Sequence, residues 1–122
     1  MTKTILVADD DPGNVSVTES LLKERGYTVL IAVDGEEALK KALAFKPQLV
    51  LLDIMMPKVD GTDVAMALRE NPKTKDIPIF FLTAVVTPED HIDSIGSANV
   101  IFPKPVNFGA LLNKIREVIG QP

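Results

Sequence analysis

The stretch Ile5-Leu6-Val7-Ala8-Asp9-Asp10-Asp11 joins a short apolar run directly to three carboxylates. Apolar runs of similar length, rich in Val, Ile and Leu and without clean polar alternation, recur along the chain at Thr4–Ala8, Thr28–Val33, Gln48–Leu52, Ile77–Leu82 and Val100–Phe102. Short runs without alternation are typical of parallel strands that are buried on both faces. The sequence therefore predicts five buried strands.

Helical patterns separate these strands. The clearest is the last one, whose apolar residues fall on one stripe at helical spacing: Phe108, Leu111, Leu112, Ile115, Val118 and Ile119. The other helices are marked by their ends: Pro12 in a first turn, Gly26 after a last turn, the capping pair Asp34 and Glu37, and Thr87-Pro88 at an N-terminus. The stretch from Asn71 to Lys75 is predicted to be loose. Five βα units give a doubly wound α/β domain, with a five-stranded parallel sheet between two layers of helices.

Length and composition limit the classes of protein. A chain of 122 residues suits one domain, which we expect to span residues 1–122. The net charge of -4 leaves no basic surface for nucleic acid. The apolar runs are far too short to span a membrane and no signal-peptide core is evident, so we expect no membrane contact and a cytoplasmic location. The absence of cysteine excludes disulfides and thiolate chemistry.

Polar side chains that follow the predicted strands are the candidate site, because ligands of doubly wound sheets bind beyond the carboxyl ends of strands. They are Asp9, Asp10, Asp11, Asp53, Thr83 and Lys104. Carboxylates that converge stay ionised only beside a cation, and Mg²⁺ prefers oxygen ligands. An aspartate carboxylate can attack phosphorus when nearby cations neutralise the developing charge. The set therefore predicts phosphoryl transfer.

The same residues carry a family resemblance that covers nearly the whole chain. The motifs are Ile5–Asp11, the run Leu51-Leu52-Asp53-Ile54-Met55-Met56-Pro57-Lys58-Val59-Asp60-Gly61, then Phe81-Leu82-Thr83-Ala84, and finally Lys104-Pro105. Together they resemble bacterial response regulator receiver domains of the chemotaxis-regulator type. The resemblance implies a flavodoxin-like sheet with strand order 2-1-3-4-5 and five helices in three layers.

The resemblance also implies a role for each site residue. Asp53 would accept the phosphoryl group, with Thr83 and Lys104 holding its oxygens. Mg²⁺ or Mn²⁺ would bind Asp10 and Asp53 directly, Asp9 through water or by orientation, and the backbone carbonyl of Met55.

Partners follow from the resemblance as well. The donor would be a sensor histidine kinase or a histidine phosphotransfer protein, and the output a changed affinity for a downstream protein or a fused output domain. Such a domain is not an enzyme acting on other substrates, since it catalyses only its own phosphorylation and dephosphorylation.

Three alternative functions fit the residues less well. An aspartate-nucleophile phosphatase of the haloacid dehalogenase type would use the spacing in Asp9-Asp10-Asp11 but leave the Asp53 motif without a role. A scaffold that binds without phosphorylation would not need the acceptor, metal and lysine positions that are filled here. In a flavodoxin, the acidic loop after the first strand would repel the flavin phosphate.

Several residues are interpreted as structural. Asp11, beside Pro12, is predicted to cap a helix rather than bind metal. Asp60-Gly61 is predicted to form a turn and a helix start, with Gly61 supplying φ freedom. Met56 is expected to pack inside. Ile101 stands where the family often has Tyr or Phe, and Phe102, which should point to the opposite face, is predicted to lie in the core. The sequence therefore leaves the switch mechanism open.

Overall fold

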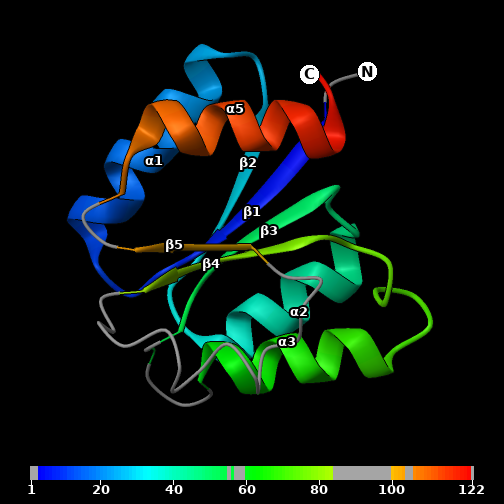
Figure 1. Ribbon diagram of the computed structural model, residues 1–122. Coiled ribbons are helices and arrows are strands. Elements are labelled where there is room, and N and C mark those ends of the chain that lie inside the picture. Colours follow the sequence, from blue (N-terminus) through cyan, green and yellow to red (C-terminus); the bar gives the residue numbers. More distant parts are fainter. Residues whose placement is uncertain (1–2, 55, 57–59, 84–99, 104–105, 122) are drawn as a thin grey trace.

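A parallel sheet lies between two layers of helices in the computed structural model, which describes residues 3–54, 56, 60–83, 100–103 and 106–121 (Figure 1). The strands are β1 (Thr4–Ala8), β2 (Thr28–Ala32), β3 (Leu49–Asp53), β4 (Ile79–Thr83) and β5 (Val100–Pro103). All neighbouring pairs are parallel, and the strand order is β2-β1-β3-β4-β5. This confirms the doubly wound, flavodoxin-like fold.

Four helices lie in the described part of the chain: α1 (Pro12–Glu24), α2 (Gly35–Phe45), α3 (Gly61–Glu70) and α5 (Phe108–Ile119). Helices α1 and α5 cover one face of the sheet, and α2 and α3 cover the other (Figure 1). The remaining predicted helix, with its start signal at Thr87-Pro88, falls within residues 84–99 and lies outside the described residues. No helix among the described residues is both long and apolar enough to cross a membrane.

The core divides at the sheet because successive side chains of a strand point to opposite faces. One cluster packs the strand residues Leu6, Leu52 and Phe81 against α2 and α3. The other packs residues such as Val7 and Phe80 against α1 and α5. Both faces of the central strands are therefore covered, which explains why their sequences lack polar alternation.

The predicted helix ends are largely confirmed. Asp11 is the N-cap of α1, and its carboxylate accepts hydrogen bonds from the backbone N–H groups of Gly13 and Asn14, at 2.9 and 3.4 Å. Asp34 caps α2 through the N–H of Glu37 at 2.8 Å. After the C-cap of α1, Gly26 adopts φ 99°, which favours glycine because it has no Cβ.

Two features of the sequence were interpreted incorrectly. The stretch from Asn71 to Lys75 is a turn rather than loose chain, because Thr74 is fully buried and donates a hydrogen bond of 2.7 Å to the Leu68 carbonyl. The apolar stripe of α5 is buried at Leu111 and Ile115. Val118 belongs to the same predicted stripe but is 41% exposed.

Residues 101 and 102 point to opposite faces, as predicted. Ile101 packs against the cluster under α2 and α3. Phe102 packs against the other cluster, with its ring 5.7 Å from that of Phe80, and is half-buried rather than fully enclosed. Met56 is buried, also as predicted.

Candidate functional site

The register of the sheet makes β1 and β3 end next to each other. Ala8 pairs with Leu52 between β1 and β3, so the next residues, Asp9 and Asp53, stand side by side at the carboxyl edge. The backbone N–H of Asp9 also binds the Ala32 carbonyl at the end of β2, at 3.0 Å. Hydrogen bonds of the sheet therefore fix the backbones that carry the acidic side chains.

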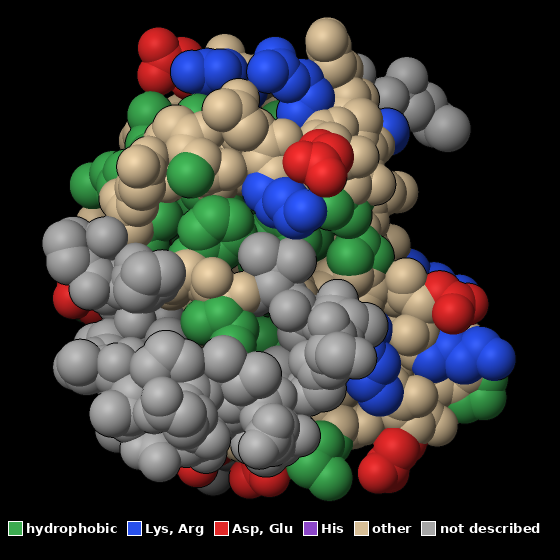
Figure 2. Space-filling model, viewed as in Figure 1, with side chains coloured by type: hydrophobic (Ala, Val, Ile, Leu, Met, Phe, Trp, Pro, Cys, Tyr) green, Lys and Arg blue, Asp and Glu red, His purple; other side chains and the backbone are tan. Residues whose placement is uncertain are grey.

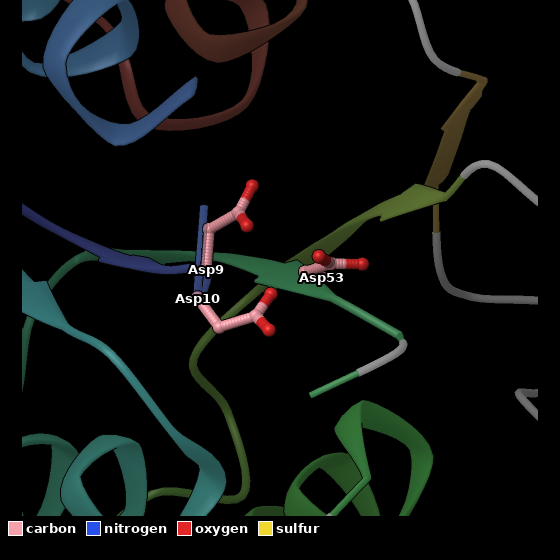
Figure 3. A group of neighbouring side chains, drawn as sticks. All are labelled: Asp9, Asp10 and Asp53. Atoms are coloured by element: carbon pink, nitrogen blue, oxygen red, sulfur yellow. The ribbon is translucent and has the colours of Figure 1, made fainter. Parts of the chain in front are cut away.

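Three carboxylates converge at this edge. Asp9, Asp10 and Asp53 each offer an oxygen, and these oxygens lie within 4.8 Å of one another. Figure 3 shows the three side chains projecting from the neighbouring ends of β1 and β3. Asp9 is 2% exposed and Asp53 5% exposed, whereas Asp10 is open to solvent. The predicted acidic cluster is thus assembled by two strands that lie far apart in the sequence.

The carboxylates of Asp9 and Asp11 accept hydrogen bonds from nearby backbone N–H groups. One carboxylate oxygen of Asp9 accepts a hydrogen bond of 2.9 Å from the backbone N–H of Asp11, which fixes the orientation of the Asp9 side chain. The Asp11 carboxylate is used as the cap of α1 and is not part of the three-residue cluster. Asp11 is therefore a structural residue, as its position before Pro12 predicted.

The geometry of the cluster fits a divalent cation. Mg²⁺ binds oxygen at roughly 2.1 Å in an octahedron, so two direct ligands of one ion stand up to about 4.2 Å apart. The three carboxylate oxygens, all within 4.8 Å of one another, are close to this separation. Three like charges, two of them buried, also repel one another without a compensating cation. Asp9, Asp10 and Asp53 could therefore hold such an ion.

Gly61 supports the Asp53 backbone in a way that the sequence did not reveal. A Cβ at position 61 would lie 2.2 Å from the Asp53 carbonyl oxygen and 2.7 Å from the Ile54 Cα, and the Gly61 N–H donates a 2.8 Å hydrogen bond to the Ile54 carbonyl. Gly61 does not have a positive φ, so the predicted reason for its presence, freedom of φ, was wrong. Close approach of two backbones is what requires glycine here. The predicted helix start is confirmed, with Asp60 as the N-cap of α3, whereas the residues that would complete the predicted turn lie outside the described residues.

The other predicted site residues are described only in part. The backbone of Thr83 ends β4, the neighbour of β3, at the same edge as Asp53. Met55 and Lys104 lie outside the described residues. The geometry therefore bears on the acidic residues, and the roles of Thr83, Met55 and Lys104 stay predictions.

Comparison with known proteins agrees with this site. The model of the response regulator receiver domain family matches residues 5–116. The DNA-binding dual master transcriptional regulator RpaA of Synechocystis sp. is 37% identical over 116 residues, which cover 94% of this chain and 48% of RpaA. PhoP of Bacillus subtilis, a transcriptional regulatory protein of alkaline phosphatase synthesis, is 48% identical over 84 residues, which cover 69% of this chain and 34% of PhoP. This chain thus spans less than half the length of either relative.

Solved structures extend the likeness. The receiver domain of the sensor histidine kinase PA1611 from Pseudomonas aeruginosa has a TM-score of 0.88 and 26% identity, covering 99% of this chain and 100% of that one. That structure has a magnesium ion coordinated in its active site cleft. CheY4 of Vibrio cholerae, a chemotaxis protein, has a TM-score of 0.86 and 29% identity, and the match covers 97% of this chain and 99% of CheY4.

Sequence and structure thus lead to the same assignment. The sheet order, the acidic residues at the ends of β1 and β3, and a family match over nearly the whole chain agree with one another. The chain belongs to the response regulator receiver domains of two-component signalling systems.

Proposed function

We propose that Asp53 accepts a phosphoryl group, with Mg²⁺ or Mn²⁺ held by Asp10, Asp53 and the Met55 carbonyl, and with Asp9 acting through water or by orientation. The observation that carries the proposal is the convergence of three carboxylate oxygens within 4.8 Å at the ends of two neighbouring strands. Three carboxylates this close repel one another, and a divalent ion and a phosphoryl group are ligands that such a cluster can serve.

The reaction is a displacement at phosphorus. A carboxylate oxygen of Asp53 attacks the phosphorus atom of a phosphohistidine, the new O–P bond forms while the N–P bond breaks, and the imidazole leaves with the electron pair. When bound, the divalent ion neutralises charge on the phosphoryl oxygens. Lys104 contributes a second positive charge to those oxygens, and Thr83 donates a hydrogen bond to one of them. The backbone contacts of Gly61 hold the end of β3 in place during the attack.

The proposed partners follow from the same chemistry. The donor is a sensor histidine kinase or a histidine phosphotransfer protein, and the output is a changed affinity for a downstream protein or a fused output domain. Residues 1–122 form one domain that catalyses only its own phosphorylation and dephosphorylation. We place it in the cytoplasm, with no contact to nucleic acid through this domain. RpaA and PhoP are named as transcriptional regulators, so an output domain of that kind is one form that the partner can take.

Phosphorylation by a small donor tests the proposal. The purified protein is incubated with acetyl phosphate and Mg²⁺, and the intact mass is measured with time. We expect one phosphoryl group, added only in the presence of a divalent ion, and no addition in Asp53→Asn. Asp11→Asn is the matched control because it removes one carboxylate beside the cluster and leaves an N-cap of equal quality.

The same experiment separates the alternatives. Addition of phosphate to Asp53→Asn at the wild-type rate would contradict the assignment of Asp53. A wild-type protein that accepts no phosphate from either acetyl phosphate or a phosphohistidine donor would favour the scaffold that binds without phosphorylation.

A further inference from the structure

A second polar hollow lies at the opposite edge of the sheet from the acidic cluster. Its cavity of about 150 Å³ lies between the end of α1 and the second half of α5, and its lining residues are Arg25, Tyr27, Leu112, Asn113, Arg116 and Gln121. Arg25 and Tyr27 precede β2, whereas the acidic residues follow β1 and end β3. The hollow is therefore separated from Asp53 by the length of the strands.

The lining carries positive charge that the described part of the chain leaves uncompensated. Arg25 and Arg116 contribute two guanidinium groups, and the described residues of the lining include no Asp or Glu. Among the described residues neither arginine forms an ion pair, whereas the nearby Lys23 is paired with Glu19 at 2.9 Å. Lys114 on α5 is likewise paired, with Glu117 at 3.3 Å. Figure 2 shows Lys and Arg side chains at the end of the molecule where α5 lies, next to Asp and Glu side chains.

Hydrogen bonds hold the backbone at Arg25 and the side chains of Arg116 and Tyr27 in place before any ligand binds. Arg25 is the C-cap of α1, and its N–H donates to the Leu21 and Leu22 carbonyls at 3.3 and 3.1 Å. The Arg116 guanidinium donates to the Asn113 side chain at 3.3 Å. Tyr27 is buried and its hydroxyl donates to the Gly120 carbonyl at 2.8 Å. A preorganised site loses less side-chain entropy when a ligand binds.

The C-terminal ends of α1 and α5 both oppose an anion in this hollow, and the end of α5 is offset by two donors. The last carbonyl groups of a helix carry partial negative charge, and α5 ends beside this hollow. The Lys3 ammonium group donates a hydrogen bond to the Ile119 carbonyl, and the Tyr27 hydroxyl donates one to the Gly120 carbonyl. These two donors reduce the repulsion that the helix end would exert on a bound anion.

We propose that this hollow binds a phosphate or diphosphate group of a small molecule. Guanidinium groups recognise phosphate through paired N–H donors, and here two arginines from different segments of the chain line the same hollow. A phosphate group offers three or more oxygens to such an arrangement, whereas a carboxylate offers two in one plane. The side-chain amides of Asn113 and Gln121 supply further donors. The site lies apart from Asp53, so the proposal does not depend on the phosphoacceptor role.

Titration with inorganic pyrophosphate, phosphate and succinate, followed by NMR of the backbone amides, tests the site. Magnesium is left out because pyrophosphate chelates it, and ionic strength is held constant with chloride. We expect saturable shifts at residues 25–28 and 112–121 with pyrophosphate, and weaker or no saturation with succinate. Arg25→Gln and Arg116→Gln should each weaken binding by about tenfold or more, since each removes a charge-assisted hydrogen bond.

Matched charge changes provide the controls. Lys23→Gln and Lys114→Gln remove the same charge from the same two helices without touching the lining, and they should change the affinity by less than about threefold because solvent and salt screen their charges. Equal losses in the arginine and lysine variants would overturn the proposal, as would an absence of saturation in the wild type. Equal affinity for succinate would overturn the choice of phosphate. Shifts confined to the amides around Asp9 and Asp53 would place the ligand at the acidic cluster instead.

Discussion

Gly61 and Asp53 are packed backbone to backbone, so closely that a Cβ at position 61 would lie 2.2 Å from the Asp53 carbonyl oxygen. Gly61→Ala must therefore move the start of α3 or the end of β3. We expect a loss of about 1–3 kcal/mol in the free energy of unfolding, as for other overpacked positions, measured by urea denaturation. Phosphorylation of Asp53 by acetyl phosphate should slow as well.

Gly109→Ala is the control for this prediction. Its Cβ would lie 3.4 Å from the Asn107 side chain, an ordinary contact, at an exposed position in the first turn of α5. We expect it to be neutral, or to stabilise by up to about 1 kcal/mol through helix propensity. A Gly61→Ala protein as stable as Gly109→Ala would show that the close approach does not constrain the site.

Magnesium should stabilise the fold through the acidic cluster. A ligand that binds only the native state raises its stability by mass action, by about 2.7 kcal/mol at a hundredfold excess over Kd. Asp10→Asn removes one of three repelling charges, so it should raise the unfolding midpoint of the metal-free protein and reduce the shift that Mg²⁺ produces. Thermal unfolding with and without Mg²⁺ measures both effects.

Asp11→Asn removes a neighbouring charge outside the cluster and should keep the full response to Mg²⁺. If the wild type and Asp10→Asn showed equal shifts, the ion would have to bind elsewhere.

Phe102 should matter for stability more than for signalling. Its ring packs 5.7 Å from that of Phe80 on the α1 and α5 face. Because the side chain is only half-buried, we expect Phe102→Ala to cost about 2–3 kcal/mol, less than the roughly 3–5 kcal/mol typical of a fully enclosed Phe. The chemical-shift response to beryllofluoride, which mimics the phosphoryl group, should persist. A near wild-type stability combined with loss of that response would contradict this assignment.

Thr83→Ala, unlike Phe102→Ala, is predicted to weaken the response to the phosphoryl group. Thr83 ends β4 beside the Asp53 strand, and its proposed hydrogen bond goes to a phosphoryl oxygen rather than to the attacking carboxylate. We expect Asp53 to remain phosphorylatable, as measured by intact mass, while beryllofluoride-induced NMR shifts in β5 become smaller. Undiminished shifts would mean that coupling between the phosphoryl group and β5 does not pass through Thr83.

Tyr27 should make the stability depend on pH in the alkaline range. Burial raises the pKa of the Tyr27 hydroxyl above its ordinary value of 10.0, and the positive charge of Arg116 opposes part of that rise. Between the unfolded and folded pKa values the unfolded chain loses this proton first, so the free energy of unfolding should fall as the pH rises above about 10. Below that pH the hydroxyl is protonated in both states and contributes no pH dependence.

Tyr27→Phe isolates the effect. It should lose about 0.5–1.5 kcal/mol near neutral pH, because the Gly120 carbonyl loses its hydrogen-bond donor, and it should show a shallower alkaline decline than the wild type. Tyr27 is the single tyrosine of the chain, so tyrosinate absorbance reports its titration directly. Parallel declines in the two proteins, or an ionisation at the ordinary tyrosine pKa, would contradict the prediction.

The sequence by itself determined the fold and the identity of the acidic residues. Runs such as Leu49–Leu52, without polar alternation, require burial on both sides, and strands separated by helices then leave a parallel sheet as the arrangement that covers both faces. The caps at Asp11 and Asp34 were also predictable, because an N-cap is a local contact between a side chain and the next turn. The position of Asp9 and Asp53 after apolar runs predicts that they lie at the same edge of the sheet.

Only the tertiary structure decided the features that depend on contacts between distant segments. The spread of 4.8 Å among the three carboxylates follows from the register of β1 and β3, which no local pattern encodes. Thr74 is buried because its hydroxyl reaches the Leu68 carbonyl, and the Tyr27 hydroxyl reaches Gly120 across the length of the chain. Gly61 shows the difference most directly. The sequence pattern places a helix start there, but the need for glycine comes from the approach of Asp53, and steric contact between two backbones exists only once the chain has folded.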